Sequence, residues 1–449
     1  MPKRTRQERL NAQLPKKIIS PKSKELELTS ESFSTEMAGG ILTFLPLIQK
    51  LKIVEAIKES NFPSTSQLSD VQLVLSFLAL KLNGGIRWSQ DDKWNLDRAL
   101  GLFAGLNVLP KATTLASYSY SISRDSNVKF LSKLSNIFSF SGEFNLDFKT
   151  IPHWGDESVL EKNWSGSKNK AIKSILSLIV QDPETGMMAY TDATIKRQNE
   201  QDAAIEFVDF WKSSTAETPK MLIFDSKFTT YQNLSKLNED EVKFLTLRRR
   251  SQSLIKYTEE LKDTDWDQVS VVRTKGKKDK LKVHESSISL RNYEGKLRQI
   301  IVTDHGRDKP AFLITNDFDM SLQNVIRKYS RRWLVEQEIA EQIAFFHLNV
   351  PGSSIVVKVD FDLTMSLLAH NLYRMLALSI PTFEKCQAQT LHRKFIENGA
   401  NIKIDKQSVI VKLKKKTHIP YLLEVPWIKN SSKIEHLGCN LELLIDSTS

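Results

Sequence analysis

The chain has 449 residues, of which 40% are hydrophobic and 26% charged, a composition typical of a globular protein of two or three domains. The two cysteines, Cys386 and Cys439, form no CxxC motif, so neither a disulfide-stabilised fold nor a zinc module is expected. The longest apolar stretches are too short or too interrupted to span a bilayer, and no signal peptide opens the chain, so we expect a cytoplasmic protein that does not bind membranes. The net charge of +11 favours a polyanionic partner, most commonly nucleic acid.

Residues 1–35 are predicted to form a disordered basic arm, because residues 1–24 hold eight Lys or Arg and one acid, Glu8. Residues 36–140 are predicted to form a helical domain. Apolar residues recur at helical spacing from Leu42 to Ile57 and from Leu68 to Leu82, where residues 64–66 offer N-caps, and two more helices are expected at 112–123 and 128–137. The position of this helical domain directly after a basic arm favours a role in DNA binding. A packing or oligomerisation domain would show the same helical pattern.

Residues 141–250 change to an α/β pattern. Apolar runs and turn signals predict five strands and two intervening helices. The strands are expected at 144–150, 174–181, 187–193, 221–225 and 243–247, and the helices at 200–212 and 229–237. A hairpin followed by strand–helix–strand alternation matches the order of an RNase H-like fold, in which carboxylates cluster at adjacent strand ends.

Residues 251–319 are predicted to form a β-rich insertion with a basic loop that holds Lys277 and Lys278. Its strands are expected at 268–272, 281–290, 297–302 and 311–315. Residues 320–385 would complete the core with a helix from about Ser321 to about His347 and another at 363–378, followed by a basic C-terminal region at 386–449. The expected fold class is therefore α/β (α+β overall), with an RNase H-like core interrupted by a β-rich insertion and preceded by a helical domain.

Three acids stand out as candidate metal ligands: Asp147 in an apolar strand, Asp225 at the end of another, and Glu336 on a helix face shared with Tyr329 and Arg332. Carboxylate oxygens suit Mg²⁺, and a pair of such ions supports phosphodiester chemistry. Each acid also has a structural explanation. Asp147 could face water on an edge strand, Asp225 could cap the N-terminus of a helix, and Glu336 could form an ion pair with Arg332. Asp360 and Asp362, expected on one strand face, are a second choice.

Four segments together resemble the DDE transposases of prokaryotic insertion sequences, in the branch with a β-rich insertion, over roughly residues 142–380. They are Leu-Asp-Phe-Lys-Thr-Ile-Pro-His-Trp-Gly at 146–155, Phe-Asp-Ser-Lys-Phe-Thr-Thr-Tyr at 224–231, Thr-Leu-Arg-Arg-Arg at 246–250, and the helix with Tyr329, Arg332 and Glu336. The resemblance implies that Asp147, Asp225 and Glu336 bind two Mg²⁺, with Mn²⁺ as a substitute. It also implies that Tyr329 and Arg332 contact DNA near the scissile end.

The implied activity is cleavage at the element ends by water, followed by attack of the freed 3′-hydroxyl on target DNA. The expected partners are double-stranded DNA, at element ends and target, and a second copy of the chain or a higher assembly, with a location at the nucleoid. The family pattern places a Lys where this chain has Ile343, so Lys328, Arg331 or the loop with Lys277 and Lys278 would supply that phosphate contact. A degenerate copy of such a transposase would also explain Ile343 at this position. The alternatives are an RNase H-like nuclease without strand transfer and a non-catalytic, transposase-derived DNA-binding protein.

Overall fold

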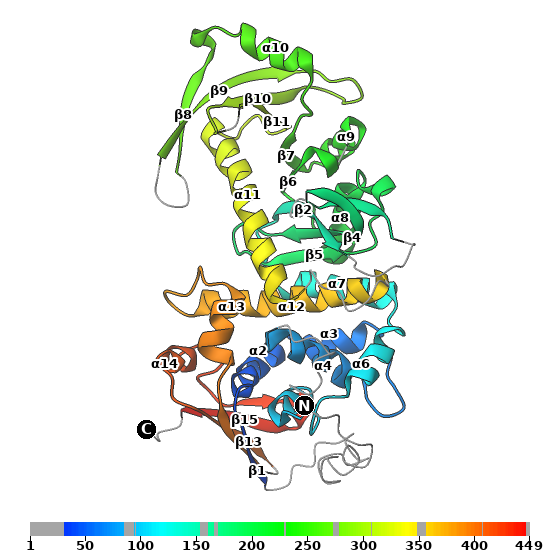
Figure 1. Cartoon of the computed structure of the whole chain (residues 1–449), viewed down its shortest axis with the longest axis vertical. Coiled ribbons are helices and arrows are strands. Elements are labelled where there is room, and N and C mark those ends of the chain that lie inside the picture. Colours follow the sequence, from blue (N-terminus) through cyan, green and yellow to red (C-terminus); the bar gives the residue numbers. More distant parts are fainter. Residues whose placement is uncertain are drawn as a thin grey trace, which may run out of the picture. The chain divides into compact units, whose positions relative to one another are not determined.

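The computed structural model contains two compact units (Figure 1). Unit 1 contains Met1–Phe130, Phe345–His347 and Leu368–Ser449, and unit 2 contains Leu131–Ala344 and Leu348–Leu367. The described residues are 31–84, 94, 96–152, 160–165, 169–228, 230–272, 278–306, 308–347, 356–405 and 407–445. Within these ranges, side chains are not described at residues 31, 165, 271–272, 278–279, 333–344 and 443–445.

Unit 1 is largely helical in its N-terminal part, as predicted. Its helices there are η1 (Gly39–Phe44), α2 (Leu45–Lys50), α3 (Ile53–Glu59), α4 (Asp70–Leu82), α5 (Arg98–Phe103), α6 (Ala112–Ser119) and the first half of α7 (Arg124–Ile137). The helical pattern from Leu42 to Ile57 is interrupted, because Lys52 adopts a left-handed conformation with φ 54° that separates α2 from α3. The N-cap of helix α4 is Ser69, in a capping box with Gln72, and the hydroxyl of Ser64, one of the predicted cap residues, accepts from the N–H of Asp70 at 3.0 Å.

The C-terminal part of the chain completes unit 1. It contributes the second half of α12 (Val356–Ser379), α13 (Ala388–Leu391), the π-helix η6 (His392–Ile396), α14 (Ile419–Leu423) and η7 (Glu435–Leu437). A five-stranded sheet has the order β1 (Glu31–Thr35), β12 (Ala400–Ile404), β13 (Ser408–Leu413), β15 (Cys439–Ile445) and β14 (Ser432–Ile434). Residues 31–35, predicted as the end of a disordered arm, are thus a strand, because Phe33 pairs with Ile402 and continues the alternation of that sheet. Residues 1–30 lie outside the described part of the chain.

Unit 2 is built on the predicted RNase H-like sheet. The strands are β2 (Glu143–Pro152), β3 (Lys162–Ser165), β4 (Lys170–Gln181), β5 (Met188–Asp192), β6 (Met221–Phe224) and β7 (Lys243–Leu247). Strands β5, β4 and β2 are antiparallel, and β6 and β7 follow β2 in parallel, which confirms the order expected from the sequence. One face is covered by α8 (Ala203–Thr215), where Phe144 packs on Phe207 and Trp211 with ring centroids 5.2 and 4.6 Å apart. Helix α9 (Tyr231–Glu239) lies beside α8, joined to it by the amide of Asn233, which donates to Asp202.

The β-rich insertion continues this sheet rather than forming a separate one. It contains α10 (Gln252–Glu260), η5 (Asp263–Asp265), β8 (Asp267–Val272), β9 (Lys278–Ile288), β10 (Leu297–Thr303) and β11 (Ala311–Thr315). Two further 3₁₀ helices of unit 2, η3 (Arg197–Asn199) and η4 (Ser226–Phe228), belong to the core. Strand β11 pairs antiparallel with β7, with Leu313 opposite Leu247, so one ten-stranded sheet runs through core and insertion. The insertion is therefore attached to the core by a full strand pairing.

Helix α11 (Leu322–Phe345) packs along the face of this sheet opposite α8 (Figure 1). Ser321 is its N-cap as predicted, since its Oγ accepts from the Asn324 N–H at 3.4 Å. Apolar residues of α11 join one buried cluster with residues of both core and insertion. That cluster comprises Met221, Ile223, Leu245, Leu281, Val283, Ile300, Val302, Leu313, Val325, Ile326 and Tyr329. The helix thus stabilises the junction of the two parts of the sheet.

Cys386 and Cys439 are free thiols, as expected, and burial raises the pKa of the Cys439 thiol. None of the helices in the described ranges is both long and apolar enough to cross a membrane.

Arg298 on β10 fastens the insertion to the start of α11. Its guanidinium binds both carboxylate oxygens of Glu285 at 2.7 and 2.9 Å and also donates to the carbonyl of Met320, just before α11. The Arg298 side chain is buried, whereas that of Glu285 is 41% exposed, so only the guanidinium side of this ion pair is shielded from water.

We expect Arg298→Ala to lower the free energy of unfolding by about 2–3 kcal/mol, because it leaves Glu285 and a buried carbonyl unpaired. Urea-induced unfolding measures this loss. Arg291→Ala, at an exposed position of the same insertion, is the control and should change stability by less than about 0.5 kcal/mol. Equal effects of the two substitutions would contradict this role of Arg298.

Candidate active site

Asp147 and Asp225 are brought together by the parallel pairing of β2 and β6. The register places Asn145 opposite Ile223, and the two aspartates each lie two residues further along. Neighbouring strands are about 4.8 Å apart, and residues in the same register point to the same face. The segments that follow also meet, since the rings of Phe148 and Phe228 stack at 3.8 Å.

The two aspartates lie on the face of the sheet that α11 covers. Ile223 belongs to the α11 cluster, and side chains two residues apart on a strand share a face. Accordingly, Arg332 of α11 reaches Asp147, with Nη1 3.9 Å from Oδ1. The Arg332 side chain is 5% exposed and that of Asp147 27%, so the pair is largely screened from solvent.

Asp147 does not lie on an edge strand, because β2 pairs with β4 on one side and, as far as Asn145, with β6 on the other. Asp225 does not cap α9, because Thr230 does so by accepting from the Asn233 N–H at 3.1 Å. Asp225 instead accepts from the N–H of Ser226 at 2.5 Å and from its hydroxyl at 3.2 Å, in the turn that leads into η4.

Glu336 lies within α11, one turn after Arg332, but its side chain is outside the described residues, as is that of Ile343. Lys277 also falls outside them, and only the backbone of Lys278 is described, in β9. Across the described side chains, no three His, Cys, Asp or Glu converge closely enough to hold a metal ion. Asp147 and Asp225 nevertheless present the hard oxygen donors that Mg²⁺ prefers.

The residues of α11 predicted to bind DNA contact the protein itself. Tyr329 is buried in the α11 cluster, with its ring centre 5.4 Å from the guanidinium carbon of Arg332. Lys328 forms a half-buried ion pair with Glu143 at the start of β2. Arg331 donates to the carbonyl of Pro183 at 3.0 Å. Together these contacts hold α11 against β2 and the β4–β5 turn.

Three other acids of unit 2 have structural roles. Asp182 is buried in the β4–β5 turn and accepts from the N–H groups of Glu184 and Thr185 at 2.7 and 3.0 Å. Asp360 and Asp362 lie on helix α12, so their prediction as a strand pair is wrong. Asp360 is fully buried and accepts from the Ala193 N–H at 2.9 Å.

Sequence reasoning missed a row of buried polar residues beneath α11. Asn145 is 2% exposed and lies opposite Gln181, which is also buried. Within the described part of the structure, neither polar atom of the Asn145 amide has a hydrogen-bond partner, and neither does Oε1 of Gln181. The signal was present, because polar residues at 143, 145 and 147 alternate with apolar ones and mark one face of β2.

Comparison with known proteins gives one family match. Residues 144–372, just over half of the chain, match the family model described as "Transposase DDE domain". Among solved structures, the chain is similar to piggyBac transposase in a cryo-EM synaptic complex with hairpin DNA. The TM-score is 0.41 at 10% sequence identity, over 82% of this chain and 88% of that chain. No curated protein matches.

The amide of Asn145, which has no hydrogen-bond partner among the described residues, leads to a stability prediction. We expect Asn145→Leu to raise the free energy of unfolding by about 1 kcal/mol, because a similar-sized apolar side chain removes an unsatisfied buried amide. The matched control is Asn163, which is also buried on a strand of this sheet but donates to the Ser174 carbonyl at 3.1 Å. Asn163→Leu should lower stability by about 1–2 kcal/mol. Thermal or urea unfolding compares them, and a loss of stability in Asn145→Leu would refute the argument.

Proposed function

Since the chain belongs to the family of DDE transposases, we propose that it cuts DNA at the ends of a mobile element and joins those ends to target DNA. Asp147, Asp225 and Glu336 would be the catalytic acids. The observation that carries this assignment is the β2–β6 register, which sets Asp147 beside Asp225 on the face covered by α11. Glu336 follows Arg332 by one helical turn on that helix, and Arg332 contacts Asp147.

We propose that these carboxylates hold divalent cations, with Mg²⁺ preferred because all the donors are hard oxygens. When bound, such cations supply an activated oxygen nucleophile and stabilise charge on the leaving oxygen. The role of the protein is to place the ligands. Strand pairing orients Asp147 and Asp225, and the hydrogen bonds from Ser226 fix one oxygen of Asp225.

Arg332 would serve the site in two ways. Its Nη1 lies 3.9 Å from Oδ1 of Asp147 and would hold that carboxylate in position as a ligand. It is also the family's expected DNA contact. Because this side chain is 5% exposed, a phosphate reaches it only if DNA docks directly against Asp147. The proposed contact is therefore at the scissile phosphate, next to Tyr329.

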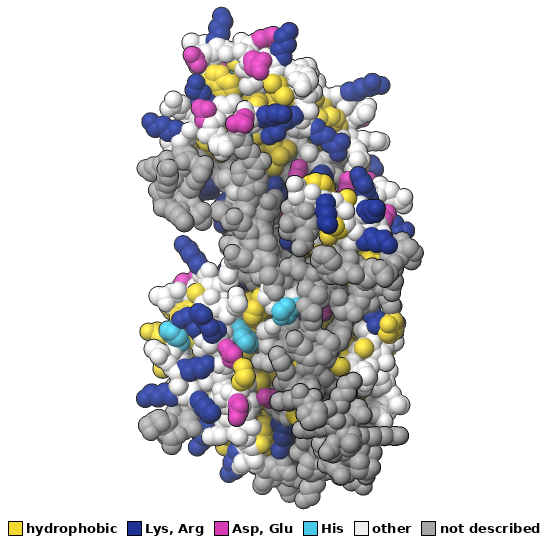
Figure 2. All heavy atoms as spheres, viewed as in Figure 1, with side chains coloured by type: hydrophobic (Ala, Val, Ile, Leu, Met, Phe, Trp, Pro, Cys, Tyr) yellow, Lys and Arg dark blue, Asp and Glu magenta, His cyan; other side chains and the backbone are white. Residues whose placement is uncertain are grey.

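Double-stranded DNA as the partner is supported by the net charge of +11 and by the basic residues 1–24. Figure 2 shows Lys and Arg side chains over the surfaces of both units, with acidic side chains among them. Near the strand ends of the site, Lys227, Arg249 and Arg250 are exposed. We propose that these cations bind DNA phosphates, that the helical domain at 36–140 binds the element ends, and that two or more copies act together at the nucleoid.

The acids are tested one at a time with a labelled duplex that carries the DNA flanking the gene. We expect Asp147→Asn, Asp225→Asn and Glu336→Gln each to reduce Mg²⁺-dependent nicking about a thousandfold or more. Several kcal/mol of transition-state stabilisation would be lost, and each 1.4 kcal/mol is about a factor of ten. DNA affinity in EDTA should stay close to that of the wild type.

Asp209→Asn, at an exposed position on α8, is the control and should leave nicking unchanged. Retained nicking in any of the three variants would remove that acid from the site. A joined-product assay with pre-cleaved ends then separates a transposase from a nuclease, because only a transposase links the 3′-hydroxyl to target DNA. Specific binding without nicking in the wild type would indicate a non-catalytic DNA-binding protein.

A further inference from the structure

The pairing of β2 with β6 stops short of the two aspartates. Its last paired residues are Asn145 and Ile223, and β6 itself ends one residue later. Asp147 stays fixed on its other side, because β2 remains paired with β4 and places it opposite Ile179. Asp225 begins the turn into η4, beyond the last pair of the β2–β6 register. The separation of the two carboxylates is therefore not set by strand pairing alone.

A ring stack crosses this gap. Phe148 directly follows Asp147, and Phe228 is the last residue of η4, three residues after Asp225. Their ring centroids are 3.8 Å apart and their planes differ by 4°. Most aromatic pairs are offset or edge-to-face, with centroids about 4.5–7 Å apart, so this pair is unusually close and parallel. Two flat rings in such contact hold the segments that carry them at one separation.

The stack lies behind the two acids. Side chains alternate along a strand, so Phe148 points to the face covered by α8, whereas Asp147 points to the face covered by α11. Phe224, just before the second aspartate, is fully buried, and its ring centroid lies 6.1 Å from that of Phe228. Phe228 is itself 1% exposed. The three rings thus form a continuous row that joins β2 to the end of β6.

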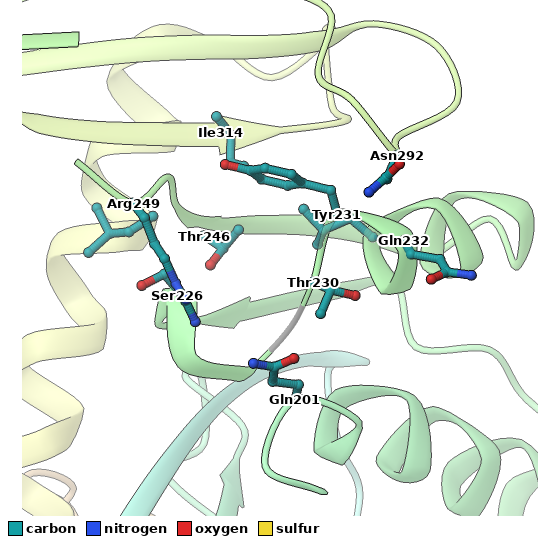
Figure 3. Close-up of a pocket in the computed structure, with 11 residues that line it drawn as sticks. Gln201, Ser226, Thr230, Tyr231, Gln232, Thr246, Arg249, Asn292 and Ile314 are labelled. Carbon is teal, nitrogen blue, oxygen red and sulfur yellow. The ribbon is translucent and has the colours of Figure 1, made fainter. Parts of the chain in front are cut away.

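On the side of β7, the turn borders on a cavity of about 340 Å³. Ser226 of the turn and Thr246 of β7 line it (Figure 3). Another wall belongs to the loop between β9 and β10, where Asn292 lies and where the N–H of Glu294 donates to the hydroxyl of Ser235 on α9 at 2.9 Å. Open space supplies no packing contacts, so the turn depends on the ring stack for its position.

The charges of the two acids make such a support necessary. The carboxylates of Asp147 and Asp225 carry like charges at neighbouring strand ends, so they repel each other until a cation binds between them. The N–H of Ser226 orients Asp225 but does not connect it to β2. A rigid contact behind the acids opposes their separation, and ligands that are already in place lose less freedom when the cation binds.

We propose that Phe148 and Phe228 are positioning residues, which hold Asp147 and Asp225 at the separation that a divalent cation requires. The rings act through the backbone of the two strand ends rather than by contact with the cation. This inference rests on the proposed function, since it takes the two aspartates as cation ligands.

The test is the affinity of the full chain for Mn²⁺, measured by calorimetric titration without DNA. Phe148→Leu removes the stack but keeps an apolar side chain, and we expect it to weaken Mn²⁺ binding about tenfold or more, the scale on which residues behind metal ligands act. Phe148→Tyr keeps the ring at this half-buried position and should bind Mn²⁺ as the wild type does.

The second measurement is the Mg²⁺ dependence of nicking, which decides the matter if Mn²⁺ binding without DNA is too weak to titrate. Phe148→Leu should need about tenfold more Mg²⁺ for half-maximal nicking and reach nearly the wild-type rate at saturation. A loss of folded protein would lower the rate at saturation instead. Phe228→Leu, which removes the other ring, should repeat this pattern.

Phe140→Leu is the matched control. Phe140 is also half-buried on the α8 side of the sheet, where its ring centroid lies 5.6 Å from that of Trp211 and 6.1 Å from that of Phe144, but it precedes β2. Loss of this ring should lower stability about as much as Phe148→Leu does, as urea unfolding would measure, and leave the affinity for Mn²⁺ and the Mg²⁺ dependence unchanged.

Wild-type metal dependence in Phe148→Leu, or an equal change in Phe140→Leu, would overturn the positioning role, even if the buried variant Phe228→Leu fails to fold. Nicking by the wild type that Asp147→Asn abolishes would then leave the proposed function standing. A wild type that neither binds Mn²⁺ nor nicks the DNA would overturn both.

Discussion

The packing of α11 across one face of the sheet is the constraint on which the candidate site depends. Val325, Ile326 and Tyr329 bury their side chains against strands of both the core and the insertion. Polar residues on the same helix, Lys328 and Arg332, then reach carboxylates of β2. The position of Glu336 follows from this burial, because a helix packed over two turns has little freedom to rotate in the next one.

The continuity of the sheet gives the insertion a direct connection to the site. Strand β11 pairs with β7, so the insertion strands extend the same layer that carries Asp147 and Asp225. The loop with Asn292 is held over α9, and Arg298 ties β10 and β9 to the start of α11. A separate domain on a flexible linker would leave these contacts variable, whereas strand pairing sets them in a single register.

Local patterns predicted the elements that are marked by an apolar run or by a cap residue. The strands at 243–247 and 311–315 and the start of α11 at Ser321 are found as expected, because apolar runs and cap residues act locally. Strand β1 was missed because its partner β12 lies near the other end of the chain, and short-range patterns carry no information about such pairing. Asp360 was assigned to a strand because a short apolar alternation fits a buried helix equally well.

The candidate site was predicted from acids that interrupt apolar strands, whereas the buried polar residues around it were not predicted. Asn145 and Gln181 beneath α11, and Thr246 on the opposite face, are buried polar groups of one sheet near the same strand ends. Among the residues that the structure describes, polar atoms of each lack a hydrogen-bond partner, and such atoms concentrate where a protein binds something or carries out chemistry. Both faces of the sheet therefore carry buried polar groups that packing alone does not require, near the strand ends that hold Asp147 and Asp225.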